Sequence, residues 1–205
     1  MPEPSLWQEL TTRDPGHAPA YIERFRTYER TGVDLGGEAR LVDALAPRRA
    51  RILDAGCGTG RVGARLHRLG HRVVGVDSDA QLLHAARADY PGPCWVQGDL
   101  AELDIVPEAT DEPFDVVVAA GNVMAFLAPS SRRRVLGQLR RRLVADGRMI
   151  AGFDLDRGYL RSEFEEDARS SGLVVEHAFC TWDLRPTRAD STYVVYVLTP
   201  GVTAE

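Results

Sequence analysis

Short apolar runs alternate with amphipathic segments along the chain from residue 50 onward. Runs of four to eight apolar residues bounded by turn residues are typical of buried strands. On this basis we predict five strands, which are Arg51–Ala55, Arg72–Asp77, Cys94–Gly98, Phe114–Ala120 and Arg148–Phe153. Because strands that alternate with helices form parallel sheets through right-handed crossovers, we expect helices on both faces of one sheet. The run VVVAA at 116–120 is apolar throughout, as a central strand should be.

Amphipathic spacing places helices between these strands. The first is predicted over Thr59–Leu69, with Gly70 as its stop signal. The second begins after Ser78, with Gln81 placed for a capping box, and ends before Pro91.

A third helix is predicted in SRRRVLGQLRRRLV, where the apolar positions form one stripe, Val135, Leu136, Leu139 and Leu143. We expect this helix to end at Gly147. The arginine runs Arg132–Arg134 and Arg140–Arg142 then form a solvated outer face, with a phosphate- or RNA-binding face as the alternative. The segment Asp99–Pro113 is less regular and is predicted to be a short or broken crossover.

The C-terminal part follows a different pattern. Leu160, Phe164 and Ala168 predict a helix that ends at Gly172. Two long β-rich runs follow, Leu173–Leu184 and Ser191–Leu198, joined by RPTRAD. They predict an antiparallel pair at one edge of the sheet.

Residues 1–50 do not share the alternation. Ser5 and Gln8 can cap a first helix, PAYIERFRTYERTG predicts a second, and GGEARLVDALAP predicts a third. In the second, Tyr21, Phe25 and Tyr28 lie on one side. This segment, a helical cap on the domain formed by residues 51–199, either covers the sheet edge or folds over a ligand site as a lid.

Composition narrows the class of protein. The chain has 205 residues, enough for one domain, and a net charge of −5, which argues against a general nucleic-acid binder. Three scattered cysteines suit neither a disulfide framework nor a CxxC metal site. There is no apolar run of membrane-span length, and MPEPSLWQEL lacks the features of a signal peptide. We therefore expect a cytoplasmic protein with no membrane partner; the sequence predicts no oligomeric state.

The stretch RILDAGCGTGRVG breaks an apolar strand with glycines and then resumes as a helix. Glycines let the backbone come close to a ligand, and the helix N-terminus favours an anion. Gly56, Gly58 and Gly60 form G-x-G-x-G, and Arg61 stands where the dinucleotide fingerprint has its third glycine. A P-loop pattern is absent.

This stretch resembles motif I of the class I S-adenosylmethionine (SAM)-dependent methyltransferases. VVGVDSD, WVQGDL, FDVVVAAGNVMAFL and LRRRLVADGRMIAGF resemble the later motifs of that family in order, so that the resemblance covers about Arg51 to Leu198. It implies an α/β fold, a three-layer doubly wound Rossmann-like sandwich. The seven-stranded sheet would be mainly parallel, with a reversed last strand at Ser191–Leu198.

The resemblance also implies where SAM, or its product S-adenosylhomocysteine, would bind. Asp77 matches the acid that binds the ribose hydroxyls, and Asp99 matches the acid beside the adenine. Asp54 either meets the ammonium group of the methionine part or makes a loop hydrogen bond. Cys57 is either a small residue tolerated in the turn or a reactive thiol. The expected cofactor-binding residues are Asp54, Gly56, Cys57, Gly58, Gly60, Asp77, Ser78, Gly98, Asp99, Leu100, Gly121 and Asn122.

No catalytic residue is assigned, because methyl transfer from a sulfonium can proceed by holding the acceptor in line. The candidates for a base are the histidines at 17, 67, 71, 84 and 177. Trp182, Asp183 and Arg185 are candidates for acceptor contact or for a structural loop. Asp154 and Asp156 are a close acidic pair, expected to cap a loop or helix, with a metal role as the alternative; we expect no metal.

The sequence thus predicts a SAM-dependent methyltransferase with a small-molecule acceptor. FDVVVAAGNVMAFL lacks the [DNS]-P-P-[YFW] pattern of the enzymes that methylate exocyclic amines of nucleic acids, and we expect no accessory domain. The alternatives are a non-catalytic SAM-binding module, such as a sensor or a partner subunit, and a nicotinamide-dependent oxidoreductase.

Overall fold

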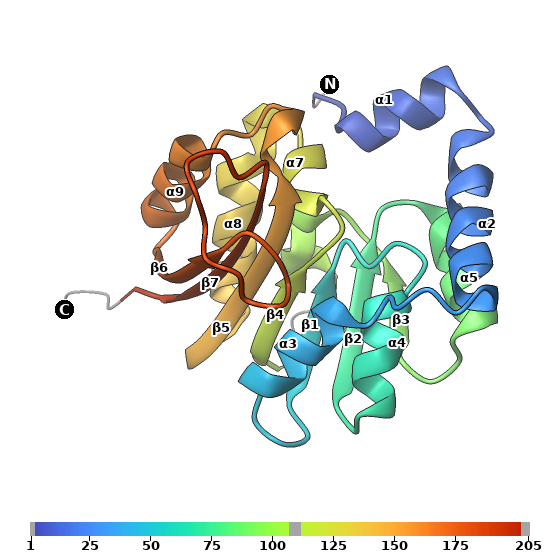
Figure 1. The fold of residues 1–205 in the computed structure, drawn as a ribbon, viewed down its shortest axis with the longest axis horizontal. Coiled ribbons are helices and arrows are strands. Elements are labelled where there is room, and N and C mark those ends of the chain that lie inside the picture. The colour runs from blue at the N-terminus through green and yellow to red at the C-terminus, as the bar shows by residue number, and fades with distance from the viewer. Residues whose placement is uncertain (1–2, 107–111, 202–205) are drawn as a thin grey trace.

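The computed structural model describes residues 3–106 and 112–201, and one sheet forms its centre (Figure 1). The strands are β1 (Arg51–Ala55), β2 (Arg72–Asp77), β3 (Cys94–Gln97), β4 (Phe114–Ala119), β5 (Leu143–Asp154), β6 (Leu173–Phe179) and β7 (Tyr193–Pro200). Their order is β3-β2-β1-β4-β5-β7-β6, and β7 runs antiparallel to both of its neighbours. This confirms the predicted doubly wound sheet with a reversed last strand.

Helices cover both faces of the sheet. One face carries α3 (Gly37–Leu45), α4 (Arg61–Arg68) and α5 (Ala80–Asp89). The other carries the 3₁₀ segment η1 (Leu100–Ile105), the short α7 (Val123–Phe126), α8 (Arg132–Arg141) and α9 (Arg161–Ser170). Short 3₁₀ turns, η2 (Pro129–Ser131) and η3 (Leu155–Arg157), join these elements.

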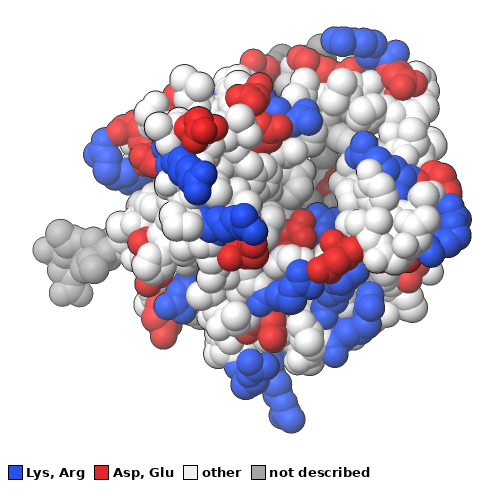
Figure 2. All heavy atoms as spheres, viewed as in Figure 1, with Lys and Arg blue, Asp and Glu red and all other residues white. Residues whose placement is uncertain are grey.

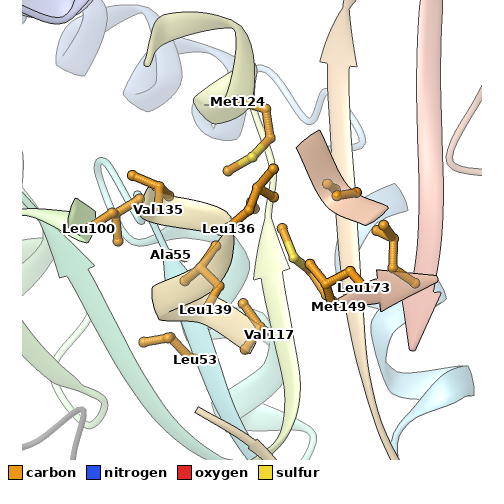
Figure 3. Close-up of a cluster of buried hydrophobic side chains, with 14 of the residues drawn as sticks. Leu53, Ala55, Leu100, Val117, Met124, Val135, Leu136, Leu139, Met149 and Leu173 are labelled. Carbon is orange, nitrogen blue, oxygen red and sulfur yellow. The ribbon is translucent and has the colours of Figure 1, made fainter. Parts of the chain in front are cut away.

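Successive residues of the central strands point into different cores. Val117 of β4 lies in the core under α8 and α9, while Val116 and Val118 lie in the core under α3 and α4. Figure 3 shows the first of these cores, where Leu136 and Leu139 of α8 pack against side chains of β1 and β4. The prediction that 116–120 is buried on both faces is confirmed.

Several predicted boundaries are wrong by a few residues, each for a local reason. Helix α8 ends at Arg141 and not at Gly147, because Leu143 already pairs with Phe114. The sheet register then shifts, so that the residues before Arg148 leave the ladder.

The start of α5 also differs from the prediction. Its N-cap is Asp79, whose carboxylate accepts from the backbone N–H groups of Gln81 and Leu82, so Ser78 is not the cap. The strand predicted to reach Leu184 ends at Phe179 as β6. The predicted crossover covers Asp99–Pro113. Its first part forms η1, and its residues 107–111 lie outside the described residues.

The arginines of α8 only partly form the expected solvated face. Arg133 and Arg134 are exposed. Arg132 is not, because its guanidinium lies 3.9 Å from the ring centroid of Tyr159 and donates to the carbonyl of Gly158. The start of this helix is therefore tied to the loop before α9.

The N-terminal segment comprises α1 (Leu6–Arg13), α2 (His17–Arg30) and α3. The predicted capping box of Ser5 and Gln8 is confirmed. Helix α3 packs against α4 as part of the layer beside the sheet. Helices α1 and α2 lie elsewhere, with α1 beyond the carboxyl ends of the strands and α2 running down beside α5 (Figure 1). An ion pair between Arg26 and Asp89 ties α2 to the end of α5.

Four fully buried aromatic rings hold α9 against β5 and β7. Phe164 lies 4.7 Å from Tyr196 and 5.0 Å from Phe153 between ring centroids, and Tyr159 completes the group. Replacing a buried phenylalanine with alanine removes apolar burial and leaves a cavity.

We expect Phe164→Ala to lower the free energy of unfolding by about 3–5 kcal/mol, measured by denaturant titration. Leu160→Ala is the matched control, because Leu160 is the N-cap residue of the same helix but is 56% exposed, and a change below about 0.5 kcal/mol is expected. Similar losses in both variants would contradict the packing described here.

Candidate functional site

The turn after β1 is shaped by glycines with left-handed backbone conformations. Gly56, Gly58 and Gly60 have φ values of 71°, 55° and 81°. A Cβ on Gly56 would lie 2.5 Å from Val123, and one on Gly60 would lie 2.8 Å from Trp95. Packing therefore excludes a side chain at these two positions. A Cβ on Gly58 would meet only the hydroxyl of Tyr21, at 3.8 Å, so this glycine borders open space.

Asp77, at the end of β2, faces this turn. Its Oδ2 accepts from the backbone N–H of Gly58 at 2.8 Å, and its Oδ1 accepts from the N–H of Asp79 at 2.9 Å. Burial nevertheless raises the pKa of this carboxyl above its ordinary value. The carboxylate is thus fixed beside the open position at Gly58, where a ligand hydroxyl would find an acceptor.

Asp54 lies deeper, at the base of the same turn. Its Oδ2 accepts from the backbone N–H of Gly63 at 2.9 Å, which joins β1 to the first turn of α4. The side chain is buried, and burial raises its pKa to about 7. The carboxylate thus makes a backbone hydrogen bond, to α4 and not within the loop, and the contact with a ligand stays a prediction.

Cys57 is a structural residue of this turn. Its side chain is buried in a small core with Ala64 and Trp95, and burial raises the pKa of the thiol well above its usual value. The reactive-thiol alternative is wrong, because a reactive cysteine needs a lowered pKa and exposure.

The third strand end contributes Gly98, Asp99 and Leu100. Asp99 is exposed, and its Oδ1 accepts from the N–H of Ala101 as the cap of η1, which leaves its other oxygen at the surface. Leu100 is buried in the core beneath α8, so its side chain packs there (Figure 3). Ser78 lies beside this strand end, and its carbonyl accepts from Gln97.

The fourth strand end is a tight turn. Gly121 and Asn122 both have positive φ, at 70° and 73°, and a Cβ on Gly121 would meet nothing within 4 Å. Asn122 turns its side chain to β5, where its Oδ1 accepts from the backbone N–H of Asp154 at 2.7 Å. Gly121 is therefore a second glycine that borders open space, and Asn122 holds the adjacent strand ends together.

These residues come from separate strands but share one edge of the sheet, where parallel strands expose their carboxyl ends. Figure 2 shows this face of the molecule hollowed just below α1. Asp77 is flanked by backbone donors, while Gly58 and Gly121 leave room for a ligand. The fold thus brings the predicted cofactor residues to one place, with Leu100 facing the core.

The histidines do not converge on this edge. His71 is buried and contacts Asp43 at 2.9 Å on the far side of α3. His67, His84 and His177 are exposed, and His17 packs against Trp7 with ring centroids 5.1 Å apart. The structure therefore provides His17 alone near the site.

Trp182 and Asp183 make different contacts. The indole of Trp182 covers Gly152 of β5 and donates to the hydroxyl of Tyr193 at 3.1 Å. Asp183 is exposed and pairs with Arg185. Beside them, a hollow of about 420 Å³ is lined by residues that include Cys180, Arg185, Arg188 and Tyr193.

Asp154 caps η3, since its Oδ1 accepts from the N–H of Asp156. This is the structural alternative expected from the sequence. Within residues 3–106 and 112–201, no cluster of three or more histidine, cysteine or acidic side chains could hold a metal ion.

Sequence reasoning missed Trp7 and Trp95, and it named Tyr21 only as part of a helix face. Trp95 packs against the glycine turn, and Tyr21 reaches Gly58 from α2. The position of Tyr21 in the middle of an amphipathic face does not predict which residue its hydroxyl would lie against.

Comparison with known proteins gives related chains. A family model described as a methyltransferase domain matches residues 52–147. A solved structure of a TehB-like SAM-dependent methyltransferase from Corynebacterium glutamicum is 45% identical, with a TM-score of 0.85 over 91% of this chain and 100% of that one.

Two curated relatives match over a smaller share of this chain. A malonyl-[acyl-carrier protein] O-methyltransferase from Pectobacterium atrosepticum is 30% identical over 71% of this chain. A magnesium-protoporphyrin O-methyltransferase from Rhodobacter capsulatus is 33% identical over 66% of it. The matched regions span only 53% and 58% of the length of these two relatives.

The raised pKa of Asp54 has a consequence for stability. The carboxyl titrates near its ordinary value of 3.8 in the unfolded chain and near 7 in the folded one. Between these values the folded state binds more protons, so stability falls as the pH rises. Asp54→Asn keeps an oxygen acceptor for Gly63 and removes the titration.

We expect the difference in unfolding free energy between wild type and Asp54→Asn to change with pH from about 4 to 7 and to level off above 7. The slope should be up to ~1.4 kcal/mol per pH unit, with the wild type losing stability faster. Urea titrations at a series of pH values measure it, and parallel curves would contradict the burial of an ionisable Asp54.

Proposed function

This chain belongs to the class I SAM-dependent methyltransferase family, and we propose that it transfers the methyl group of SAM to a small-molecule acceptor. The observation that carries the proposal is the pair of open glycines at the carboxyl edge, Gly58 after β1 and Gly121 after β4, with the Asp77 carboxylate beside the first. This arrangement suits a ligand that carries both hydroxyl groups and a charged amino-acid part.

The residues present fit SAM in their chemistry. Asp77 would accept from the ribose hydroxyls, because its carboxylate is already oriented by two backbone N–H groups. Asp99 would lie beside the adenine with its exposed oxygen. Asp54 would support the ammonium group from below, with its charged form favoured by a cation. Backbone at Gly56, Gly58, Gly60 and Gly121 would form the walls.

Positioning is the chain's main contribution to the reaction. SAM, when bound, supplies a methyl group on a sulfonium with a good leaving group. The residues around it then need to hold the acceptor in line and to exclude water, and holding reactants in the right geometry supplies much of a rate enhancement. A base is needed only for an acceptor that must lose a proton, and His17 is the one histidine near the site.

The acceptor would approach from the side of Trp182 and Tyr193. The hollow of about 420 Å³ beside them has the size of a small-molecule site and carries Arg185 and Arg188. Residues 1–50 would cap the catalytic domain of residues 51–199. No described helix is both long and apolar enough to cross a membrane. A cytoplasmic location and a small acceptor both remain parts of this proposal.

Two alternatives have distinct consequences. A non-catalytic SAM-binding module would bind SAM but release no S-adenosylhomocysteine with any acceptor. A nicotinamide-dependent oxidoreductase would bind NADH, and the membership of the methyltransferase family argues against it.

Calorimetric titration of the purified chain with SAM, S-adenosylhomocysteine and NADH tests the proposal first. Binding of the first two without NADH is the expected result, followed by S-adenosylhomocysteine release in an acceptor screen. Binding of NADH alone would overturn the assignment of the cofactor.

We expect Asp77→Asn to weaken SAM binding by roughly 1.5–3 kcal/mol, because a hydrogen bond to a charged group is lost. The dissociation constant is measured by calorimetry. Asp115→Asn is the matched control, since Asp115 also accepts a backbone N–H, from Arg51, but at the opposite end of the sheet. Equal affinity in wild type and Asp77→Asn would remove Asp77 from the site.

A further inference from the structure

The loop between β6 and β7 passes over β5 and carries the hollow of about 420 Å³ (Figure 1). Trp182 anchors this loop, because its indole lies on Gly152 and donates to the hydroxyl of Tyr193 at 3.1 Å. The carbonyl of Gly152 accepts in turn from the backbone N–H of Asn122 at 3.4 Å, in the turn after β4. Tyr193 also lines the hollow, which therefore lies next to the ends of β4 and β5.

Two arginines of the lining, Arg185 and Arg188, are held through their backbone. The carbonyl of Arg185 accepts from the N–H of Cys180 at 2.8 Å, and its N–H donates to the hydroxyl of Thr181 at 3.2 Å. The N–H of Arg188 donates to Oγ of Ser191 at 2.9 Å, and its carbonyl accepts from the N–H of Ser191 at 3.2 Å. Both turns are thus closed without either guanidinium, so that these charged groups extend from fixed points of the loop.

The two guanidinium groups differ in their partners. Nε of Arg185 lies 3.3 Å from Oδ2 of Asp183. The side chain of Arg188 makes no hydrogen bond or ion pair within residues 3–106 and 112–201. Asp190 is the acidic residue of the lining, and in the same part of the chain no ion pair joins it to either arginine. The hollow is therefore lined by two positive charges and one negative charge, and Arg188 is the charge left open to a ligand.

This charge pattern indicates the chemistry of the group that the hollow would take. A guanidinium offers donors in a planar fork that matches the oxygens of a carboxylate or a phosphate. A concave wall excludes part of the water that would otherwise screen the interaction, so an anion in the hollow is held more strongly than one on a flat surface. The volume is sufficient for such a group together with part of the molecule that carries it.

We propose that the hollow is a subsite for an anionic group of the acceptor, a carboxylate or a phosphate, and that Arg188 is its main specificity-determining residue, with Arg185 beside it. The inference rests on the proposed function, because it assigns the class of that function's acceptor. The anionic group would be bound and not methylated, and the rest of the acceptor would extend past Tyr193 toward the strand ends. The small-molecule acceptor is thereby narrowed to organic acids and phosphate esters.

Ligand-detected NMR titration with three probes of similar size tests the subsite. The probes are benzoate, phenyl phosphate and the neutral benzyl alcohol, in a buffer free of phosphate and carboxylate, with and without S-adenosylhomocysteine. We expect wild type to bind at least one of the anions and not the alcohol. The comparison of benzoate with phenyl phosphate decides which of the two anionic groups the hollow prefers.

Arg188→Gln should raise the dissociation constant of the bound anion about threefold to tenfold, because a charged hydrogen-bonding partner is lost from a partly exposed position. Arg141→Gln is the matched control. Arg141 is also exposed and makes no ion pair in the described ranges, but it lies at the end of α8, on the other face of the sheet. This variant should bind the anion as wild type does.

Asp183→Asn gives a result that misfolding cannot imitate. Its carboxylate competes with a bound anion for the guanidinium of Arg185, so that its neutralisation should tighten anion binding about twofold or more. The melting temperatures of Asp183→Asn and Arg188→Gln should stay near that of wild type, since both side chains are exposed. Unchanged or weaker anion binding in Asp183→Asn would remove Arg185 from the subsite.

The outcomes separate this proposal from the proposed function. The subsite is overturned if no anion binds, if benzyl alcohol binds as well as the anions, or if Arg141→Gln weakens anion binding as much as Arg188→Gln does. Binding of S-adenosylhomocysteine decides the proposed function independently. A wild type that binds an anion through Arg188 but binds no S-adenosylhomocysteine would keep the anion subsite and overturn the proposed function.

Steady-state kinetics with an acceptor found by the S-adenosylhomocysteine-release screen then tests whether the subsite serves the reaction. Arg188→Gln should raise KM for that acceptor about threefold to tenfold and leave kcat within about twofold, because the contact is the same in the ground state and the transition state. A neutral ester or amide of the same acceptor should show equal KM values in wild type and variant. An acceptor that has no anionic group, or a KM that Arg188→Gln leaves unchanged, would overturn the proposed class.

Discussion

The absence of space for a side chain at Gly56 is the constraint on which the site depends. Gly56 directly follows β1 and lies against Val123, the first residue of α7 after β4, with no room for a Cβ between them. The loops that follow two neighbouring parallel strands can therefore meet closely. Because β1 and β4 are adjacent, this contact closes the base of the site, and the two glycines that remain open, Gly58 and Gly121, lie on either side of it.

Electrostatics adds a second constraint at the same edge. Asp54 and Asp77 are carboxyl groups whose pKa values burial raises, and each accepts backbone N–H groups of the glycine-rich turn or its helix. Folding thus holds acidic groups in a place where their charged forms are disfavoured. A cationic ligand relieves that penalty, because a nearby positive charge favours the ionised carboxylate. In the proposed function the ammonium group of SAM would relieve this penalty at Asp54, while Asp77 would accept from the ribose hydroxyls.

Much of this edge follows from local sequence patterns. The strands β1, β2 and β4 are short apolar runs, and the turn glycines lie at the point where one of them breaks, so strand ends and site residues could be placed without a structure. Packing between distant segments was harder to foresee. Arg132 was expected in solvent, but it covers Tyr159, and α8 gives way early to β5 because Leu143 pairs with Phe114.

The N-terminal segment shows more clearly that contacts between distant residues do not follow from local sequence patterns. The capping box of Ser5 and Gln8 is a local feature and was predictable, whereas the bond from Trp7 to Asp79 joins positions 72 residues apart. Asp79 accepts from that tryptophan with Oδ2 and caps α5 with Oδ1, a second role that had been expected near the neighbouring serine. Neither role follows from the spacing of apolar residues alone.

The inner side of the site, at the strand ends, and its outer side are built in different ways. This difference determines which residues could be substituted without disturbing the rest of the site. In the proposed function, strand ends of the sheet would supply the cofactor side through Asp77 and the glycines. The outer side comes from α1, α2 and the loop that carries Trp182, which are attached by a few hydrogen bonds and ring contacts. Trp182 rests on Gly152 of β5 at a position where any Cβ would clash, so even this loop has a fixed anchor on the sheet. Changes to the residues beyond that anchor would alter the acceptor side while leaving the hydrogen bonds at Asp77 in place.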